Sequence, residues 1–416
     1  MRILLIPNTT NYKDFKKLYF KLALKNHVEI LIWHKELKKK ISDVPGENIK
    51  IHKNILYWNM KKYHDNLFSF NIFKKTFLII SDFYWAKNFL NKHKYNKIIS
   101  FGDREIAFNL ALLKIAKIKN ITTFININFA SGNYKDLINR RLNSRKFKII
   151  KKNNFFSKFF NKQFKKYKKN SLVSFYSFFE TVLYFIIGIL PKNPWVIGGG
   201  NSDYIFVENE IVYRDYINKG CLKKKILISY SLDAINILRS IKKYKKIKQK
   251  KIIIFFSQLY EHGDISKKTN LISLNKYCSF IKYLKNKYKL NILVSLHPKQ
   301  NLNDYSWIKK KFKFKITKQD FSKIIYDSHC VISEIRSSVA VWTRILNKKF
   351  YIINFNKRNF QATKELHNSY FENFVDFEKE FKKNLEKSDK IKKNNVNYFS
   401  NHKHKNILIE KISNNL

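Results

Sequence analysis

Glycine, proline, arginine and cysteine are scarce in this sequence. Its 416 residues include 9 Gly, 5 Pro and 3 Cys, and only about ten of the 84 basic residues are Arg. Lys, Asn, Ile, Phe and Tyr are abundant throughout, a pattern typical of an AT-rich genome. The formal net charge of +54 is therefore mostly lysine of compositional origin, and alone it does not predict a specific nucleic-acid partner. The scarce residue types carry more information, because they stand against this trend.

The cysteines exclude two classes of site. Cys221, Cys278 and Cys330 are odd in number and far apart, so they predict neither a disulfide framework nor a metal centre. The opening MRILLIPNTT has an apolar run too short for a signal peptide and is typical of a first β-strand. We therefore expect a cytoplasmic protein.

Short apolar runs alternate with amphipathic helical stretches along the chain. RILLIPN, VEILIWH, KIISFGD and ITTFININ in the first half are typical of buried parallel strands. DYIFVEN, KILISY, KIIIFFSQ, NILVSLHP, CVISE and KFYIINF continue the alternation in the second half. The pattern predicts an α/β protein with two Rossmann-like domains facing a central cleft, where ligands bind at the carboxyl ends of strands.

Four regions are expected from this alternation. Residues 1–138 would form an N-terminal Rossmann-like domain for an acceptor, and residues 196–385 a second one for a nucleotide donor. Residues 139–195 would be a membrane-facing insertion or linker. Residues 386–416 would be a tail or a closing helix.

The region between the expected domains joins a basic arm to an apolar stretch. Residues 140–169 contain thirteen Lys or Arg and no acid, interleaved with Phe, and residues 172–190 carry only one charge, Glu180. A membrane-spanning helix needs about twenty apolar residues, so the length permits a span, whereas the charge opposes one. Three interpretations stay open: a buried interdomain helix, docking on an anionic membrane surface, and a span.

The scarce glycines mark two further positions. In FGDRE, Asp103 follows a strand where free backbone N–H groups would favour an anion or a catalytic carboxylate, or where Asp103 would cap the next helix. The run Gly198, Gly199 and Gly200 suits an interdomain hinge or a close approach to a ligand. It is not a GxGxxG followed by a helix, so it does not predict a dinucleotide site.

The most informative residues follow three strands of the second half. Glu261 and His262 lie in SQLYEHGD after one strand, as site residues or in a solvated turn. Pro298 fixes His297 at the end of another strand, beside Lys299. After a third strand, which is expected to lie next to the strand of His297, Ser337 and Ser338 would begin a helix and form a phosphate seat. Close to the serines, Arg336 is expected to make a bidentate contact to phosphate, and Glu334 is expected to contact the ribose or the base.

A strand ends in HP, and about thirty-five residues later an acidic residue, two serines and a helix follow. The order resembles the C-terminal half of GT-B transferases that use cytidine nucleotides. Bacterial sialyltransferases with HP and SS motifs and CDP-glycerol glycerophosphotransferases have this order, which covers roughly residues 200–356. The resemblance implies that the donor phosphate contacts His297, Ser337 and Ser338. The general-base motif of the sialyltransferases is absent from the N-terminal half. UDP-sugar 2-epimerases share the layout but carry Ser-Gly-Gly where this chain has RSSV.

These observations predict a metal-independent GT-B glycosyltransferase that moves a sugar, most simply from a CMP-sugar, to a cell-surface glycan or lipid-linked acceptor. No cofactor is expected beyond the nucleotide-sugar substrate. Asp103 is the first candidate for the base, and Glu261 or His262 the second. Gly199 and Gly200 would line the donor site. A UDP-sugar 2-epimerase, a CDP-glycerol-type transferase and a non-catalytic basic RNA- or membrane-binding protein are the alternatives.

Overall fold

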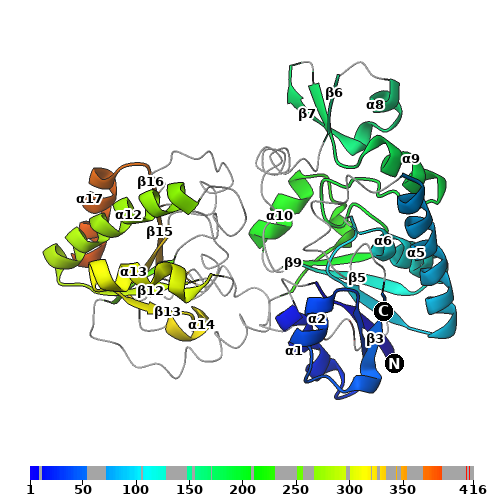
Figure 1. Ribbon diagram of the computed structural model, residues 1–416, viewed down its shortest axis with the longest axis horizontal. Coiled ribbons are helices and arrows are strands. Elements are labelled where there is room, and N and C mark those ends of the chain that lie inside the picture. Colours follow the sequence, from blue (N-terminus) through cyan, green and yellow to red (C-terminus); the bar gives the residue numbers. More distant parts are fainter. Residues whose placement is uncertain are drawn as a thin grey trace. The chain divides into compact units, whose positions relative to one another are not determined.

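The computed structural model describes residues 1–8, 12–53, 72–104, 106–127, 148–151, 155–169, 171–207, 210–229, 251–255, 267–296, 300–319, 321–325, 328–333, 343, 348–353, 369–386, 409 and 412. The chain divides into two compact units, unit 1 with residues 1–232 and 405–416, and unit 2 with residues 233–404. Each unit has its own parallel sheet and its own core (Figure 1).

Unit 1 is built on a sheet whose described strands lie in the order β10-β9-β5-β4-β1-β2-β3, all parallel. This is the Rossmann order with one strand added, and the direction of winding reverses between β1 and β4. The strands inside the sheet are apolar and buried over most of their length, because helices cover both faces of such a sheet, whereas the edge strands β3 and β10 are only partly buried. They are β1 (Arg2–Ile6), β2 (His27–Ile32), β3 (Ile49–Ile51), β4 (Lys97–Ser100), β5 (Thr122–Ile127), β9 (Tyr204–Val207) and β10 (Ile226–Ile228).

The helices of unit 1 show the periodicity read from the sequence. In α1 the buried residues are Phe15, Leu18, Tyr19 and Leu22, a spacing that places them on one helical face. Helix α6 is buried along nearly its whole length. The helices are α1 (Tyr12–Leu22), α2 (Lys35–Lys40), α5 (Ile72–Lys92), α6 (Ala107–Ile118), α8 (Phe155–Phe159), α9 (Phe178–Ile186) and α10 (Glu210–Asn218), with 3-10 turns η1 (Gly46–Asn48), η2 (Asn161–Gln163) and η3 (Lys223–Lys225).

The apolar stretch 172–190 is not one continuous helix. Its first residues belong to β8 (Ser171–Ser174), which pairs antiparallel with β6 (Lys148–Lys151) and β7 (Phe164–Lys168). Ser177 then caps α9 in a reciprocal capping box with Glu180, and a capping box marks a helix start. Along the described helices, none is both long enough and apolar enough to cross a membrane. Of the three interpretations, one interdomain helix and a span are therefore contradicted, because Ser177 and Glu180 begin a short helix within the stretch.

The boundary between the units differs from the expected one at residue 196. Strands β9 and β10 continue the sheet of unit 1, since β9 pairs in parallel with β5, and the boundary follows Leu232. Residues 139–195 thus lie within unit 1 and are not a linker between the units. The C-terminal residues also return to unit 1, where the Lys97 ammonium donates to the carbonyl of Ile412 at 2.8 Å.

Unit 2 repeats the Rossmann order. Its described strands lie in the order β13-β12-β11-β14-β15-β16, all parallel, and the winding reverses between β11 and β14. The elements are β11 (Lys251–Phe255), α12 (Lys267–Tyr288), β12 (Asn291–Ser295), α13 (Leu302–Phe312), β13 (Lys315–Thr317), α14 (Phe321–Ile324), β14 (Cys330–Ser333), β15 (Lys349–Ile353), β16 (Tyr370–Phe371) and α17 (Phe374–Glu386).

The core of unit 2 lies on both faces of this sheet. Along β11, Ile252 and Ile254 belong to the larger cluster with α12, α13 and α17, whereas Ile253 belongs to a smaller cluster with Ile324 and Ile325. The alternation follows from the two-residue period of a strand. A strand buried on both faces is the arrangement that its continuous apolar run predicts.

Candidate functional site

The carboxyl edge of the unit 2 sheet collects the predicted donor-binding segments. Phe255 at the end of β11 is in register with Ser295 of β12 on one side and with Ser333 of β14 on the other. Parallel strands present their carboxyl ends at one edge, and ligands of open α/β sheets bind where the winding reverses. That position lies between β11 and β14. Ser295 and Ser333 are both buried there.

The predicted residues themselves lie in the chain that follows these strand ends. They fall outside the described residues, so their expected roles stay predictions: Glu261, His262, His297, Pro298, Lys299, Glu334, Arg336, Ser337 and Ser338.

One expectation about this edge was wrong. We expected the histidine and the serines to follow neighbouring strands, but β11 lies between β12 and β14. Strands two positions apart in a sheet are separated by about 10 Å. β11, the strand that precedes Glu261 and His262 in the sequence, therefore ends between the strands that precede the other two segments.

The described residues on either side of His297 are firmly held. Leu296 is buried, and its N–H donates to the carbonyl of Thr317 at 3.0 Å. Gln300 is fully buried and donates from Nε2 to the hydroxyl of Tyr305 at 2.8 Å. Asn301 then caps α13 by accepting from the N–H of Asn303. Both ends of the HP segment are thus anchored in the core of unit 2.

In unit 1, Asp103 follows β4 at the corresponding edge and is fully buried. Its Oδ1 accepts from the N–H of Gly198 at 2.8 Å, and its Oδ2 accepts from the N–H of Gly200 at 3.0 Å and from the hydroxyl of Ser202 at 2.8 Å. Helix α6 begins later, with Ile106 at its N-cap. Asp103 therefore holds the triglycine turn and does not cap the helix. Its role as a base stays a prediction.

The triglycine turn is packed tightly inside unit 1. A Cβ on Gly199 would lie 2.0 Å from the carbonyl oxygen of Asn193, and one on Gly200 would lie 2.4 Å from the carbonyl oxygen of Asp103. Gly198 has φ of +89°, which favours glycine. The expected interdomain hinge was wrong, because the turn lies within unit 1. Donor contacts by Gly199 and Gly200 stay a prediction, and backbone packing already explains these glycines.

Charged groups surround this turn. The Lys225 ammonium donates to the carbonyl of Ser202 at 2.6 Å, and burial lowers the pKa of Lys225, although Asp103 opposes the change. Burial and then the Asp103 carboxylate raise the pKa of the Cys221 thiol to about 11. Arg104 donates to the carbonyl of Trp195 at 3.0 Å. The GDR sequence therefore joins the end of β4 to the chain around the triglycine turn.

A histidine that sequence reasoning missed lies at the same edge of unit 1. His52 directly follows β3, and its Nε2 is 2.9 Å from Oδ1 of Asp82 on α5, with both residues buried. The rings of Trp85 and Phe108 lie 3.9 and 5.2 Å from the imidazole. A carboxylate that orients one ring nitrogen is the arrangement of a histidine base. The available signal was a histidine at a strand end, and Asp82 gave none because helix α5 brings it there.

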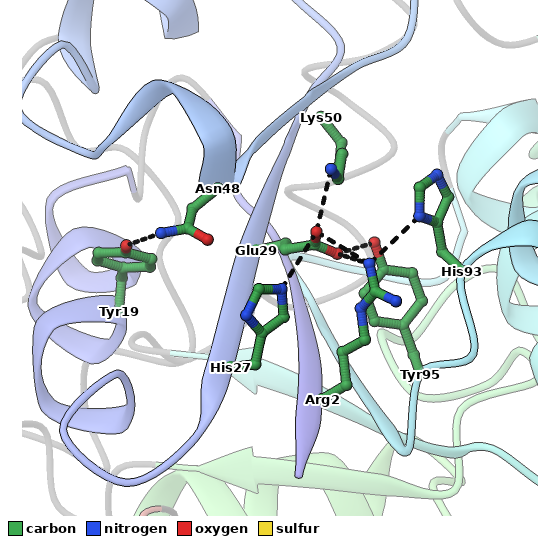
Figure 2. Close-up of polar contacts among 8 residues, drawn as sticks. All are labelled: Arg2, Tyr19, His27, Glu29, Asn48, Lys50, His93 and Tyr95. Carbon is green, nitrogen blue, oxygen red and sulfur yellow. Dashed lines mark hydrogen bonds and ion pairs between the residues drawn. The ribbon is translucent and has the colours of Figure 1, made fainter.

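A second polar cluster occupies the amino edge of the unit 1 sheet (Figure 2). Buried Glu29 accepts from Arg2 at 3.1 Å and from Lys50 at 3.0 Å, and Tyr95 donates to it. Burial alone would raise the pKa of Glu29, but Tyr95, Arg2 and Lys50 outweigh it and lower the pKa to about 2. Because Arg2 begins β1 and Tyr95 precedes β4, the cluster lies away from the ligand edge and ties strands together.

Metal ligands do not gather in the described parts of either unit: they contain no group of three His, Cys, Asp or Glu side chains arranged for an ion.

No protein-family model and no curated protein matches the chain. Among solved structures, the UDP-GlcNAc 2-epimerase of Neisseria meningitidis bound to UDP-GlcNAc is similar, with TM-score 0.50 and 13% identity over 93% of this chain and 92% of that chain. A putative UDP-N-acetylglucosamine 2-epimerase of Listeria monocytogenes has TM-score 0.50 and 9% identity over 93% and 88%. At these identities the likeness concerns the fold. It confirms the predicted α/β fold of the GT-B type with two Rossmann-like domains.

Proposed function

We propose that this protein is a glycosyltransferase that moves a sugar from a nucleotide-sugar, with a CMP-sugar favoured, to a cell-surface glycan or lipid-linked acceptor. The donor binds at the carboxyl edge of the unit 2 sheet, and unit 1 takes the acceptor. The three cysteines are buried and free, which supports a reducing compartment and hence the cytoplasm.

The strand order of unit 2 is the observation that carries this proposal. The winding reverses between β11 and β14, and the segments with Glu261, His297 and the two serines follow β11, β12 and β14. Three motifs chosen from the sequence alone thus follow the strand ends nearest the reversal, where open α/β sheets bind ligands. A non-catalytic basic protein gives no reason for this coincidence.

The proposed reaction is a displacement at the anomeric carbon. The acceptor hydroxyl oxygen forms a bond to that carbon, the bond from the carbon to the donor phosphate oxygen breaks, and the phosphate leaves with the electron pair. His297, Ser337 and Ser338 stabilise the charge that develops on the leaving phosphate, with Arg336 and Lys299 beside them. Glu334 contacts the nucleoside.

The base that takes the acceptor proton has candidates in both units. Asp103 is the first from the sequence, with Glu261 and His262 second. All the hydrogen bonds that Asp103 accepts come from the triglycine turn and Ser202, which weighs against it. His52 joins the candidates because buried Asp82 orients its ring.

A second candidate function is a UDP-sugar 2-epimerase. The two similar solved structures reported above are described as a UDP-GlcNAc 2-epimerase and a putative UDP-N-acetylglucosamine 2-epimerase. Inverting the configuration at C2 removes one hydrogen and adds another, so the product gains solvent hydrogen at that carbon. A transferase exchanges no carbon-bound hydrogen of the sugar and consumes an acceptor. The two reactions therefore differ in isotope label and in acceptor requirement.

The test begins with the full chain and a panel of CMP-, CDP-, UDP- and GDP-sugars, with thermal unfolding as the readout. A ligand at about 100 times its dissociation constant adds about 2.7 kcal/mol to the free energy of unfolding. The donor that protects is then incubated in D2O with and without glycan and lipid-linked acceptors, and the products are analysed by mass spectrometry. We expect acceptor-dependent transfer without deuterium in the sugar.

Each alternative has its own result. Deuterium at C2 without acceptor identifies the epimerase, and protection by CDP-glycerol with glycerophosphate transfer identifies the glycerophosphotransferase. Protection by no sugar nucleotide contradicts both enzyme proposals. A variant with Ser337→Ala and Ser338→Ala should lose nucleotide affinity, because each hydrogen bond to a charged group contributes about 1.5–3 kcal/mol. Unchanged affinity would leave the serines only a capping role.

A further inference from the structure

Two short helices of unit 1 expose large apolar side chains to solvent. On α8, Phe155 and Phe159 are 82% and 62% exposed. On α9, Phe178, Phe185 and Ile186 are 62%, 53% and 72% exposed. Single exposed apolar residues are ordinary on protein surfaces, but contiguous patches mark interaction sites.

These side chains belong to one surface because the two helices contact each other. The rings of Phe159 and Phe185 pack edge to face with centroids 5.9 Å apart. Phe156 packs against Phe178 at 4.3 Å, and Phe160 against Phe185 at 5.4 Å. In Figure 1, α8 and α9 lie in the same part of unit 1, next to the sheet of β6 and β7.

The charge around this surface has one sign. Four exposed lysines belong to α8 and the chain that follows it: Lys158, Lys162, Lys166 and Lys169. Across residues 137–202 the only acid is Glu180. That carboxylate accepts from Ser177 inside the capping box and lies 2.7 Å from the Lys75 ammonium. Its charge is therefore compensated within the fold, and it does not offset these lysines.

We infer that this surface docks unit 1 on an anionic membrane. The Phe/Lys face comprises Phe155, Phe159, Phe178, Phe185 and Ile186 with Lys158, Lys162, Lys166 and Lys169. Aromatic and aliphatic side chains enter the headgroup boundary, and lysines are attracted to anionic headgroups. RNA could bind the lysines and stack on the rings, but it would not explain the exposed Ile186. An acidic protein partner could pair with the lysines, but it would not explain the exposed aromatic rings. The inference stands independently of the proposed reaction.

The experiment is co-sedimentation of the full chain with two kinds of vesicle. One contains phosphatidylcholine alone, and the other also contains about 30% of the anionic lipid phosphatidylglycerol. We expect binding to the anionic vesicles only, with most of the protein released at high salt. Serine at Phe155, Phe159, Phe178 and Phe185 should lower the partition coefficient at least about tenfold. Glutamine at the four lysines should lower it by about one to two orders of magnitude and weaken its salt dependence.

Matched controls separate the Phe/Lys face from composition. The lysine control carries glutamine at four exposed lysines elsewhere: Lys223, Lys224, Lys309 and Lys310. The apolar control carries serine at exposed Leu24 and Leu222. We expect both controls to bind like the unchanged chain, and circular dichroism with thermal unfolding confirms that every variant is folded.

Four results would overturn the inference. The first is absence of binding to anionic vesicles. The second is an equal loss of binding in the lysine variant and its control, which would assign binding to bulk charge. The third is unchanged vesicle binding in the phenylalanine variant. If single-stranded RNA displaces the protein from vesicles while the phenylalanine variant retains its RNA affinity, the lysines serve nucleic acid and the membrane assignment falls.

Discussion

The carboxyl edges of the two sheets share a strand order but are filled differently. In unit 1, the protein's own groups occupy the edge: Asp103 holds the triglycine turn, and His52 is bound to Asp82. In unit 2, buried Ser295 and Ser333 end their strands, and the predicted phosphate-binding residues follow. A shared topology therefore indicates where a ligand can bind, and the side chains decide what each edge does.

The scarce residues at the two edges also have different explanations. In the triglycine turn, Gly199 and Gly200 have close backbone neighbours and Gly198 has the Ile205 side chain against it, so packing explains these scarce glycines. The HP and SS motifs follow strands of unit 2 in the sequence, and the role proposed for them is ligand binding. Variants at the two edges should thus separate stability from catalysis.

The largest effect is expected at the edge of unit 2. Replacing His297 by Ala should lower turnover by about 10² to 10³ with little change in the melting temperature, because an electrostatic stabiliser of the leaving group acts mainly in the transition state. Steady-state kinetics measures turnover with the donor that the sugar-nucleotide panel selects. Thermal unfolding measures the melting temperature. Turnover within a few-fold of the unchanged protein removes His297 from the mechanism.

The next effect is expected at the triglycine turn. Gly199→Ala should lower the free energy of unfolding by about 3 kcal/mol, the upper end for overpacking, because its Cβ would meet the Asn193 carbonyl oxygen at 2.0 Å. Gly102→Ala is the control, since no heavy atom lies within 4 Å of its added Cβ. Urea unfolding measures both. Equal stability of the two variants would mean that the turn relaxes and is not a packing constraint.

The amino edge of unit 1 provides a reference at the opposite end of the strands from the carboxyl edge where ligands are proposed to bind. Glu29→Gln should lower the free energy of unfolding at pH 7 by on the order of 2–3 kcal/mol, because the folded pKa of Glu29 lies at about 2, below its ordinary 4.5. A depressed carboxyl pKa stabilises above pH 4.5, and this stability is lost as the pH falls towards 2. The difference between the two proteins should therefore shrink over that window.

Urea unfolding at several pH values from 7 to 2.5 checks this expectation. Gln at Asp43, which is an exposed carboxylate paired with Lys16, is the control and should change stability by less than about 1 kcal/mol. A constant difference between the Glu29 variant and the unchanged protein at every pH would contradict the linkage.

The smallest effect is expected at Asp103. Asp103→Asn should lower the free energy of unfolding by about 2 kcal/mol, because an amide NH2 would face one of the donors now bound by the carboxylate. Ser202→Ala removes one of these donors and should reduce stability by about half as much. Turnover per folded molecule should stay within about tenfold. An inactive but fully stable Asp103→Asn variant would restore Asp103 as the base and would weaken the contrast between the two edges.

Much of the local structure was readable in the sequence. Every apolar run assigned to a strand contains one, from β1 to β15, because a buried strand requires only four to six consecutive apolar residues. The amphipathic period of α1 was equally visible. The stretch 172–190 misled because composition shows apolar length, whereas the capping box of Ser177 and Glu180 sets where the helix begins.

The candidate site was only partly predictable for the same reason. Residues adjacent in sequence to strand ends could be selected, as His297 and Ser337 were. Partners distant in sequence could not: Asp103 meets Gly198 and Gly200 across nearly a hundred residues, and His52 meets Asp82 from another element. Such pairs depend on how strands and helices pack, and one sequence holds no record of that contact.

The sequence by itself determined the α/β class and the position of most strands, and it selected the segments proposed to bind phosphate, because these depend on the period and type of neighbouring residues. Only the tertiary structure decided that β9 and β10 join the first sheet, that β11 lies between β12 and β14, and that the C-terminal Ile412 returns to Lys97. Strand pairing is a contact between residues far apart in the chain, and several pairings satisfy the same apolar runs. The choice among them is made by the packing of the whole unit.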